Sequence, residues 1–486
     1  MLTLLEKIFF SCIVLKKRGD EYIDQTKQVL ITAIGRTDPI RGMYDGPILH
    51  IIRHYKPRYA YILYTEELYK EYMDDKRMSK TIELLCEKEG FVCDVNDIQT
   101  GIKRPHDMDE FATTLKKEIF DIYKKYENAE FLFNLTSGTQ QIGAALRLIA
   151  VTGNKKVIAL EVDTPEKRSN KECIVGEKYD IQEEFENNFD NLAEAANRCR
   201  ETDLIEFRKT LLISKIVEEV KSYNYNSAFM LADQDELDAI DKDSALYRHL
   251  EMAHKRINFQ LHYIKANREK YAEFPSVFPV KNDDVFEVFE YYLKLKVKFQ
   301  KREYADGVLL LSPILKEFCQ VWLRKEYGFD IKKITITEKA QNREMLDYDK
   351  AKKYCPACES LWEKIFKANS SKKVNSLRID ITAYNLLNIV KEFNEKELNE
   401  KREKVTRYLE MLREVESKIR NFVAHDFMEI STDTFQKKCN ISTKDFINII
   451  EDAFLEIYHE YITDQSAFLA YESLNKLIVD ECNKFC

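Results

Sequence analysis

The segment Arg420-Asn421-Phe422-Val423-Ala424-His425 combines three side-chain types that can act on a phosphodiester bond. A histidine titrates near neutral pH and can transfer protons in either direction. The guanidinium of Arg420 can stabilise charge on phosphoryl oxygens, and Asn421 can orient the phosphate or His425. Because the 2′-hydroxyl of RNA supplies the nucleophile, one interpretation of this segment is a metal-free RNA-cleaving site.

Helical spacing places these three residues away from the helix's own core. The apolar stripe consists of Leu412, Val415, Ile419, Phe422 and Val423. Asn421 and His425 are four residues apart on the opposite side, and Arg420 lies at the flank, so they face water or another polypeptide. A solvated helix face is the simpler interpretation. One histidine and one arginine form a small catalytic set, which two copies across a twofold axis would enlarge.

Two polar loops in the first third of the chain could bind an anion. The first loop is Gly35-Arg36-Thr37-Asp38-Pro39-Ile40-Arg41, and the second is Asn134-Leu135-Thr136-Ser137-Gly138-Thr139-Gln140-Gln141. The second loop leads into a helix, whose N-terminal N–H groups and dipole favour a phosphate. Gly138 permits close approach, Thr136, Ser137 and Thr139 offer hydroxyls, and Asn134 and Gln140 can read a base or ribose. Arg36 or Arg41 could add charge, or pair with Asp38.

The elements around these loops predict a doubly wound sheet. Apolar, β-rich runs indicate strands at 29–34, 59–64, 91–98, 131–135 and 156–162, and helical periodicity indicates helices at 46–55, 66–88, 108–126 and 139–151. Such alternation favours a parallel sheet, in which strand order 3-2-1-4-5 makes strands one and four neighbours. Both loops then open into one cleft. The sequence has no triphosphate or dinucleotide glycine motif, which disfavours triphosphate hydrolysis and dinucleotide redox chemistry. Two interpretations stay open: the second loop merely caps its helix, or the two loops bind a nucleotide-like ligand.

The rest of the chain is predicted to be nearly all helix. Ten of the 12 glycines lie at or before Gly176, which indicates a change of architecture near there. We therefore expect an N-terminal extension at 1–28, a nucleotide-sensing α/β domain at 29–180 and a helical region at 181–486. The apolar patch near the start lacks the features of a signal peptide, and no run reaches the length of a membrane span.

Charge and cysteine usage narrow the function classes. The 486 residues include 76 basic and 84 acidic side chains, a net charge of −8, which excludes a globally basic nucleic-acid coat but not a local basic groove. Eleven irregularly spaced cysteines suggest reduced thiols in the cytoplasm. Cys355 and Cys358 form a CxxC pair without the second pair that structural zinc requires, so we expect no metal.

Together, the two loops and the 420–425 motif resemble the CARF–HEPN ribonucleases, the standalone accessory effectors of type III-A CRISPR systems. The resemblance implies a Rossmann-like CARF domain followed by an all-α HEPN domain, with Arg420, Asn421 and His425 as the catalytic set. It implies that Gly35, Arg36, Thr37, Asp38, Asn134, Thr136, Ser137, Gly138, Thr139 and Gln140 hold a cyclic oligoadenylate, with a ring of six favoured over four.

The resemblance further implies a cytoplasmic homodimer that needs no cofactor and cuts single-stranded RNA without metal in antiviral defence. Some relatives also degrade their activator in the CARF pocket, which would make Thr136 the residue to test. Two alternatives stay open. The chain could be a non-catalytic nucleotide-sensing regulator, or an enzyme whose CARF domain mainly destroys cyclic oligoadenylate.

Overall fold

The computed structural model describes residues 28–104, 107–153, 155–165, 179–234, 240–338, 343–368, 378–396, 399–425 and 430–485. The chain divides into two compact units, one ending at Lys209 and the other beginning at Thr210. The predicted extension at 1–28 lies outside the described residues except for Gln28, which begins the first strand. No helix in the described ranges is long and apolar enough to cross a membrane.

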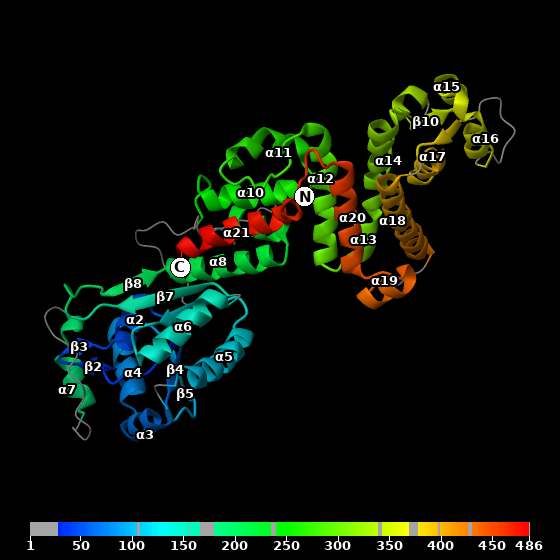
Figure 1. Cartoon of the computed structure of the whole chain (residues 1–486). Coiled ribbons are helices and arrows are strands. Elements are labelled where there is room, and N and C mark those ends of the chain that lie inside the picture. The colour runs from blue at the N-terminus through cyan, green and yellow to red at the C-terminus, as the bar shows by residue number, and fades with distance from the viewer. Residues whose placement is uncertain are drawn as a thin grey trace, which may run out of the picture. The chain divides into compact units, whose positions relative to one another are not determined.

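The first unit is built on a six-stranded sheet (Figure 1). In spatial order the strands are β5 (Asp94–Gln99), β4 (Tyr59–Tyr64), β1 (Gln28–Ala33), β6 (Glu130–Asn134), β7 (Val157–Val162) and β8 (Cys199–Thr202). The first five pair in parallel, and β8 pairs antiparallel with β7. This confirms the predicted doubly wound sheet and its 3-2-1-4-5 order.

Helices cover both faces of the sheet, as the continuous burial of β1 requires. Leu30 packs in the core with α2 (Pro47–Tyr55) and α4 (Arg77–Glu89). Its neighbours Val29 and Ile31 pack in a second core with α5 (Met108–Lys125) and α6 (Gln140–Thr152). The remaining elements are α3 (Glu66–Asp75), α7 (Ile181–Glu186), the 3-10 turn η2 (Phe189–Asn191) and a small hairpin of β2 (Ile40–Arg41) and β3 (Tyr44–Asp45).

The residues just after 180 still belong to the first unit, which ends at Lys209. Its segment Cys199–Thr202 is the antiparallel edge strand β8, so the compact unit extends past the predicted boundary to Lys209. A four-residue strand with a mostly polar sequence has too little apolar alternation to be recognised before its partner is known.

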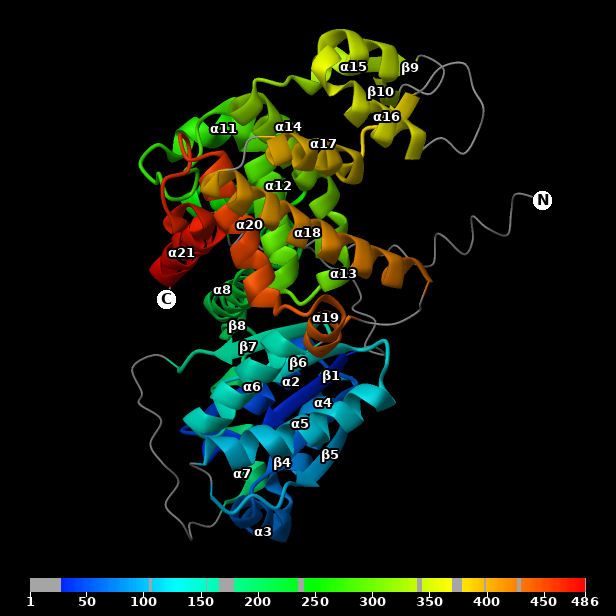
Figure 2. The ribbon, with the colours of Figure 1, turned by 45° about the vertical axis from the view of Figure 1, so that its right-hand side comes forward.

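The second unit is a helical assembly (Figure 2). Its buried apolar residues in the described ranges form one core. Its helices are α8 (Ile205–Lys221, which begins just before the unit boundary), α9 (Tyr225–Asp233), α10 (Ala245–Ile257), α11 (Leu261–Asn267), α12 (Asp283–Gln300), α13 (Tyr304–Leu309), α14 (Leu311–Tyr327), α15 (Tyr348–Tyr354), α16 (Glu359–Ala368), α17 (Ala383–Lys396), α18 (Glu400–His425), α19 (Thr432–Cys439), α20 (Thr443–Ile457) and α21 (Ala470–Cys482). A small antiparallel sheet of β9 (Thr335–Glu338), β10 (Arg343–Asp347) and β11 (Arg378–Asp380) interrupts the helices. The 420–425 motif therefore occupies the end of a 26-residue helix.

Candidate functional site

The two predicted ligand loops meet at the carboxyl edge of the sheet. They follow β1 and β6, which are hydrogen-bonded neighbours. At their closest approach, a Cβ added to Gly35 would lie 2.9 Å from the backbone nitrogen of Gly138. A side chain at residue 35 cannot fit at that distance without movement of the second loop. The structure thus brings the loops together as the strand order predicts.

Asp38 is part of the frame of the first loop, because its carboxylate is buried. One oxygen accepts a hydrogen bond from the Gly35 N–H and the other from the Ile48 N–H, each at 3.0 Å. Burial raises the pKa of Asp38 to about 6, against the lowering effect of these N–H donors. Arg36 does not pair with it. The Arg36 guanidinium lies 2.8 Å from Glu67 and 3.5 Å from Glu71.

Asn134 is the centre of the second loop and is fully buried. Its amide nitrogen donates to the hydroxyls of Thr32 and Ser137, both at 2.9 Å. Its carbonyl oxygen accepts from the N–H groups of Thr136 at 2.9 Å and Ser137 at 3.3 Å. All four contacts are internal, so Asn134 and the buried Ser137 shape the loop and leave ligand contact to its exposed residues.

The residues left at the surface of the second loop are Thr136, Gly138 and Gln140. Gly138 has a φ of +88°, a conformation that favours glycine. The Thr136 hydroxyl accepts from the Val162 N–H at 2.8 Å, and the half-buried Thr139 caps α6 by accepting from Ile142. The exposed residues of the second loop and the half-buried Arg36 and Thr37 of the first loop form a polar surface at the N-terminus of α6. An anion is favoured at such a position.

Tyr72 of α3 also holds the first loop, a role that the sequence analysis did not predict. Its buried hydroxyl lies 3.1 Å from the carbonyl oxygen of Gly35 and 2.9 Å from that of Asp38. The contact spans more than 30 residues of sequence, and no local pattern predicts such a pairing. The available signal was an aromatic residue at helical spacing from other apolar residues of α3.

One cluster of the first unit has metal-ligand residue types. Asp45, His50 and Asp190 place their ligand atoms within 4.8 Å of one another. Two guanidiniums already neutralise the carboxylates, since Arg53 lies 2.6 Å from Asp45 and Arg198 lies 2.7 Å from Asp190. Burial alone would raise the pKa of Asp45, but hydrogen bonds from His50 and Arg53 lower it to about 2. These residues therefore form an ion-pair network in which arginines already balance the carboxylate charges. The network joins the β2–β3 hairpin to the segment before β8.

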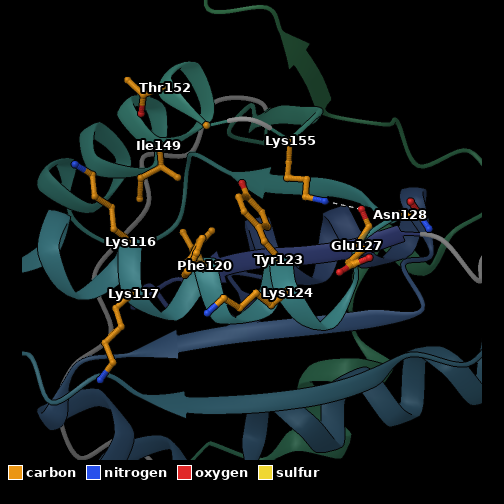
Figure 3. A pocket seen from close by; sticks show the side chains of 12 residues that line it. Lys116, Lys117, Phe120, Tyr123, Lys124, Glu127, Asn128, Ile149, Thr152 and Lys155 are labelled. Carbon is orange, nitrogen blue, oxygen red and sulfur yellow. Dashed lines mark hydrogen bonds between the residues drawn. The ribbon is translucent and has the colours of Figure 1, made fainter. Parts of the chain in front are cut away.

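A groove of about 710 Å³ lies between α5 and α6 (Figure 3). The groove is lined by apolar and aromatic side chains and by several lysines. Among them are Lys116, Phe120, Tyr123, Lys124 and Lys155. The Lys155 ammonium donates to the carbonyl oxygen of Glu127 at 2.6 Å. No predicted ligand residue lines this groove, so it is distinct from the loop site.

The motif helix presents part of the predicted catalytic set to solvent. Leu412, Val415 and Ile419 are buried, as the apolar stripe predicts. Asn421 is exposed, and the Arg420 side chain is 61% exposed. His425 is the last residue of α18, and its side chain lies outside the described part of the structure. The predicted outward direction is therefore observed for two of the three residues.

Two family models match the chain, one in each unit's sequence. The Cas_Csm6 CARF domain matches residues 94–199, and the Cas_Csm6 HEPN domain matches residues 277–479. The first match contains β5, β6 and β7 and ends at the first residue of β8, and the second contains all of α18.

Curated relatives match in both short and nearly complete alignments. The CRISPR system endoribonuclease Csm6 of Streptococcus thermophilus is 25% identical over 475 residues, which cover 93% of this chain and 99% of that protein. The protein of the same name from Enterococcus italicus is 24% identical over 310 residues, 62% of this chain and 68% of that one. The one from Mycobacterium tuberculosis is 29% identical over 206 residues, 42% of this chain and 49% of that one.

A solved structure shares the fold. Enterococcus italicus Csm6 bound to cyclic hexa-2′-fluoro-hexa-dAMP superposes with a TM-score of 0.60 at 18% identity, over 93% of this chain and 99% of that one. The likeness extends through both units.

Proposed function

The chain belongs to the Csm6 family of CARF–HEPN proteins, and from this membership we propose that it is an endoribonuclease of CRISPR defence activated by cyclic oligoadenylate. The observation that carries the proposal is the order of the two family matches, with the Arg420–His425 motif inside the second. Relatives aligned with the chain are named endoribonucleases.

We propose that Arg420, Asn421 and His425 cut single-stranded RNA without a metal. His425 takes the proton of the 2′-hydroxyl as its oxygen attacks the neighbouring phosphorus, and the bond from phosphorus to the 5′-oxygen breaks. A proton returned to the 5′-oxygen completes the step and leaves a cyclic phosphate on the other product. Arg420 stabilises charge on the phosphoryl oxygens, and Asn421 orients the phosphate. The exposure of Arg420 and Asn421 supports this assignment.

We assign activator binding to the meeting point of the two loops. Thr136, Gly138, Thr139 and Gln140 offer hydroxyl, backbone and amide groups at the N-terminus of α6, and Arg36 and Thr37 extend this surface. Gly35, Asp38, Asn134 and Ser137 hold its shape from below. We favour a ring of six adenylates over four, because the Enterococcus italicus relative was solved with a cyclic six-nucleotide analogue.

A homodimer completes the proposal, because a single histidine and arginine make a sparse active site. Two copies of α18 facing each other would supply both sets to one RNA pocket. We place this dimer in the cytoplasm, where its thiols stay reduced. By this proposal, the polar side of α18 faces a second copy of the chain.

The test is an RNA cleavage assay in EDTA, with each cyclic oligoadenylate added in turn. We expect cleavage of single-stranded RNA only with the matching ring, undiminished by EDTA, and at least 1,000-fold slower in Arg420→Ala and His425→Ala. Both variants should retain activator binding and the oligomeric state. Unchanged cleavage in both variants would refute the active-site assignment, and loss of activity in EDTA would refute metal independence.

A further inference from the structure

The apolar stripe of α18 contains a carboxylate. Glu416 is 3% exposed and lies between the buried residues Val415 and Ile419. Burial raises the pKa of the Cys319 thiol of α14 to about 12, and the charge of Glu416 adds to this rise. A buried carboxylate is costly unless cations neutralise it, and apolar packing prevents it from turning towards water.

Two arginines of the same helix share this carboxylate. One turn before it, the Nη1 of Arg413 lies 2.9 Å from Oε2. One turn after it, the Nη1 of Arg420 lies 3.9 Å from Oε1. Each guanidinium thus uses a different oxygen. The three groups together carry one net positive charge, so the shared anion restrains Arg420 without cancelling its charge.

A neighbouring pair shows why burial matters. Glu414 and Lys418 are also four residues apart on α18, but their side chains are 59% and 40% exposed. Such a surface pair is screened by water and restrains its cation weakly. The Glu416 side chain is only 4% exposed and held by its packing, so it offers the exposed Arg420 guanidinium a fixed anion at 3.9 Å.

We propose that Glu416 is a positioning residue of the RNA-cleaving site, which directs the Arg420 guanidinium to where charge develops on the scissile phosphate. This inference rests on the proposed function. A guanidinium stabilises a transition state most when it is already in place, because no reorganisation is then needed during the reaction. A freely rotating arginine would have to be ordered at each turnover.

The test compares kcat and KM of activated RNA cleavage in Glu416→Gln with two matched controls on the same helix. Glu414→Gln removes an exposed carboxylate, and Leu412→Ala destabilises α18 without touching Arg420. Glu416→Gln should lower kcat about 10- to 100-fold with little change in KM or in the activator concentration for half-maximal activity. Both controls should stay within about 3-fold of the parent in kcat. Glu416→Asp, which keeps the charge on a shorter stem, should be intermediate.

Thermal unfolding of each variant separates positioning from folding. If Glu416→Gln loses no more kcat than an equally destabilised Leu412→Ala, or if Glu416→Asp is no better than Glu416→Gln, the positioning role is refuted. Arg420→Ala separates the proposed active site from the inference about Glu416. Full activity in Arg420→Ala overturns the proposed active site itself, whereas an inactive Arg420→Ala beside a fully active Glu416→Gln overturns only the inference about Glu416.

Discussion

Replacing Asn134 by alanine should loosen the second loop while leaving its exposed surface chemically intact. The change removes four hydrogen bonds and leaves the N–H groups of Thr136 and the buried Ser137 without this acceptor. At about 1 kcal/mol for each bond, the expected loss is about 4 kcal/mol, a large part of the 5–15 kcal/mol that typically stabilises a domain.

The two units can be followed separately, because the chain's two tryptophans, Trp322 and Trp362, lie in the second one. Tryptophan fluorescence in urea should therefore be unchanged in Asn134→Ala. Hydrogen exchange of peptides from β6 and the second loop should be faster by a factor of about 1,000, which corresponds to the loss of about 4 kcal/mol. Activation of RNA cleavage should need at least 10-fold more cyclic oligoadenylate.

Gln140→Ala is the matched control, since Gln140 is exposed in the same loop. It should weaken activation without altering hydrogen exchange. If Asn134→Ala behaves in the same way, with unchanged exchange and weaker activation, then Asn134 contacts the ligand directly and its assignment to the loop's frame is refuted.

Two further predictions concern buried charge. Because the pKa of Asp38 is raised to about 6, the folded state binds this proton more tightly than the unfolded chain, so the associated stability is complete below about pH 4 and lost as the pH rises through 6. The unfolding free energy of the parent minus that of Asp38→Asn should fall by about 3 kcal/mol between pH 4 and pH 7, and a pH-independent difference would contradict this. In the second unit, Arg256 and Glu290 form a buried pair at 2.6 Å, so Arg256→Met should cost about 3–5 kcal/mol in urea unfolding followed by tryptophan fluorescence. The double variant Arg256→Met with Glu290→Met should recover most of that loss, and a double variant as unstable as the single one would show that the pair is not the cause.

The sheet was predictable because its pattern is local. The apolar run of β1 and the alternation of strands and helices specify a parallel sheet with both faces covered, and the order of strands follows from chain connectivity. One predicted helix at 66–88 proved to be two, α3 and α4, which meet at Lys76 with a φ of 56°. Lysine is not a typical breaker residue, so the sequence shows no interruption there.

The meeting of the two loops was predictable, but the contacts of their individual side chains were not. Loop sequence and strand order placed the two loops together, yet Asp38 and Asn134 turn inward, where burial and backbone N–H donors hold them. Residue type alone cannot distinguish a polar side chain that binds a ligand from one that binds its own loop. The sequence analysis did not identify Glu416 as a buried residue. A glutamate on a long charged helix is normally expected to face solvent, but Glu416 is buried.

The close approach of Gly35 to Gly138 has a consequence for changing which activator the protein accepts. The two loops of the proposed recognition surface cannot be redesigned independently, since any larger residue at position 35 would displace the loop that follows β6. A combinatorial library should hold both glycines fixed and diversify Arg36, Thr37 and Gln140, whose side chains reach the surface. Altered ring preference would then arise from new contacts on an unchanged frame.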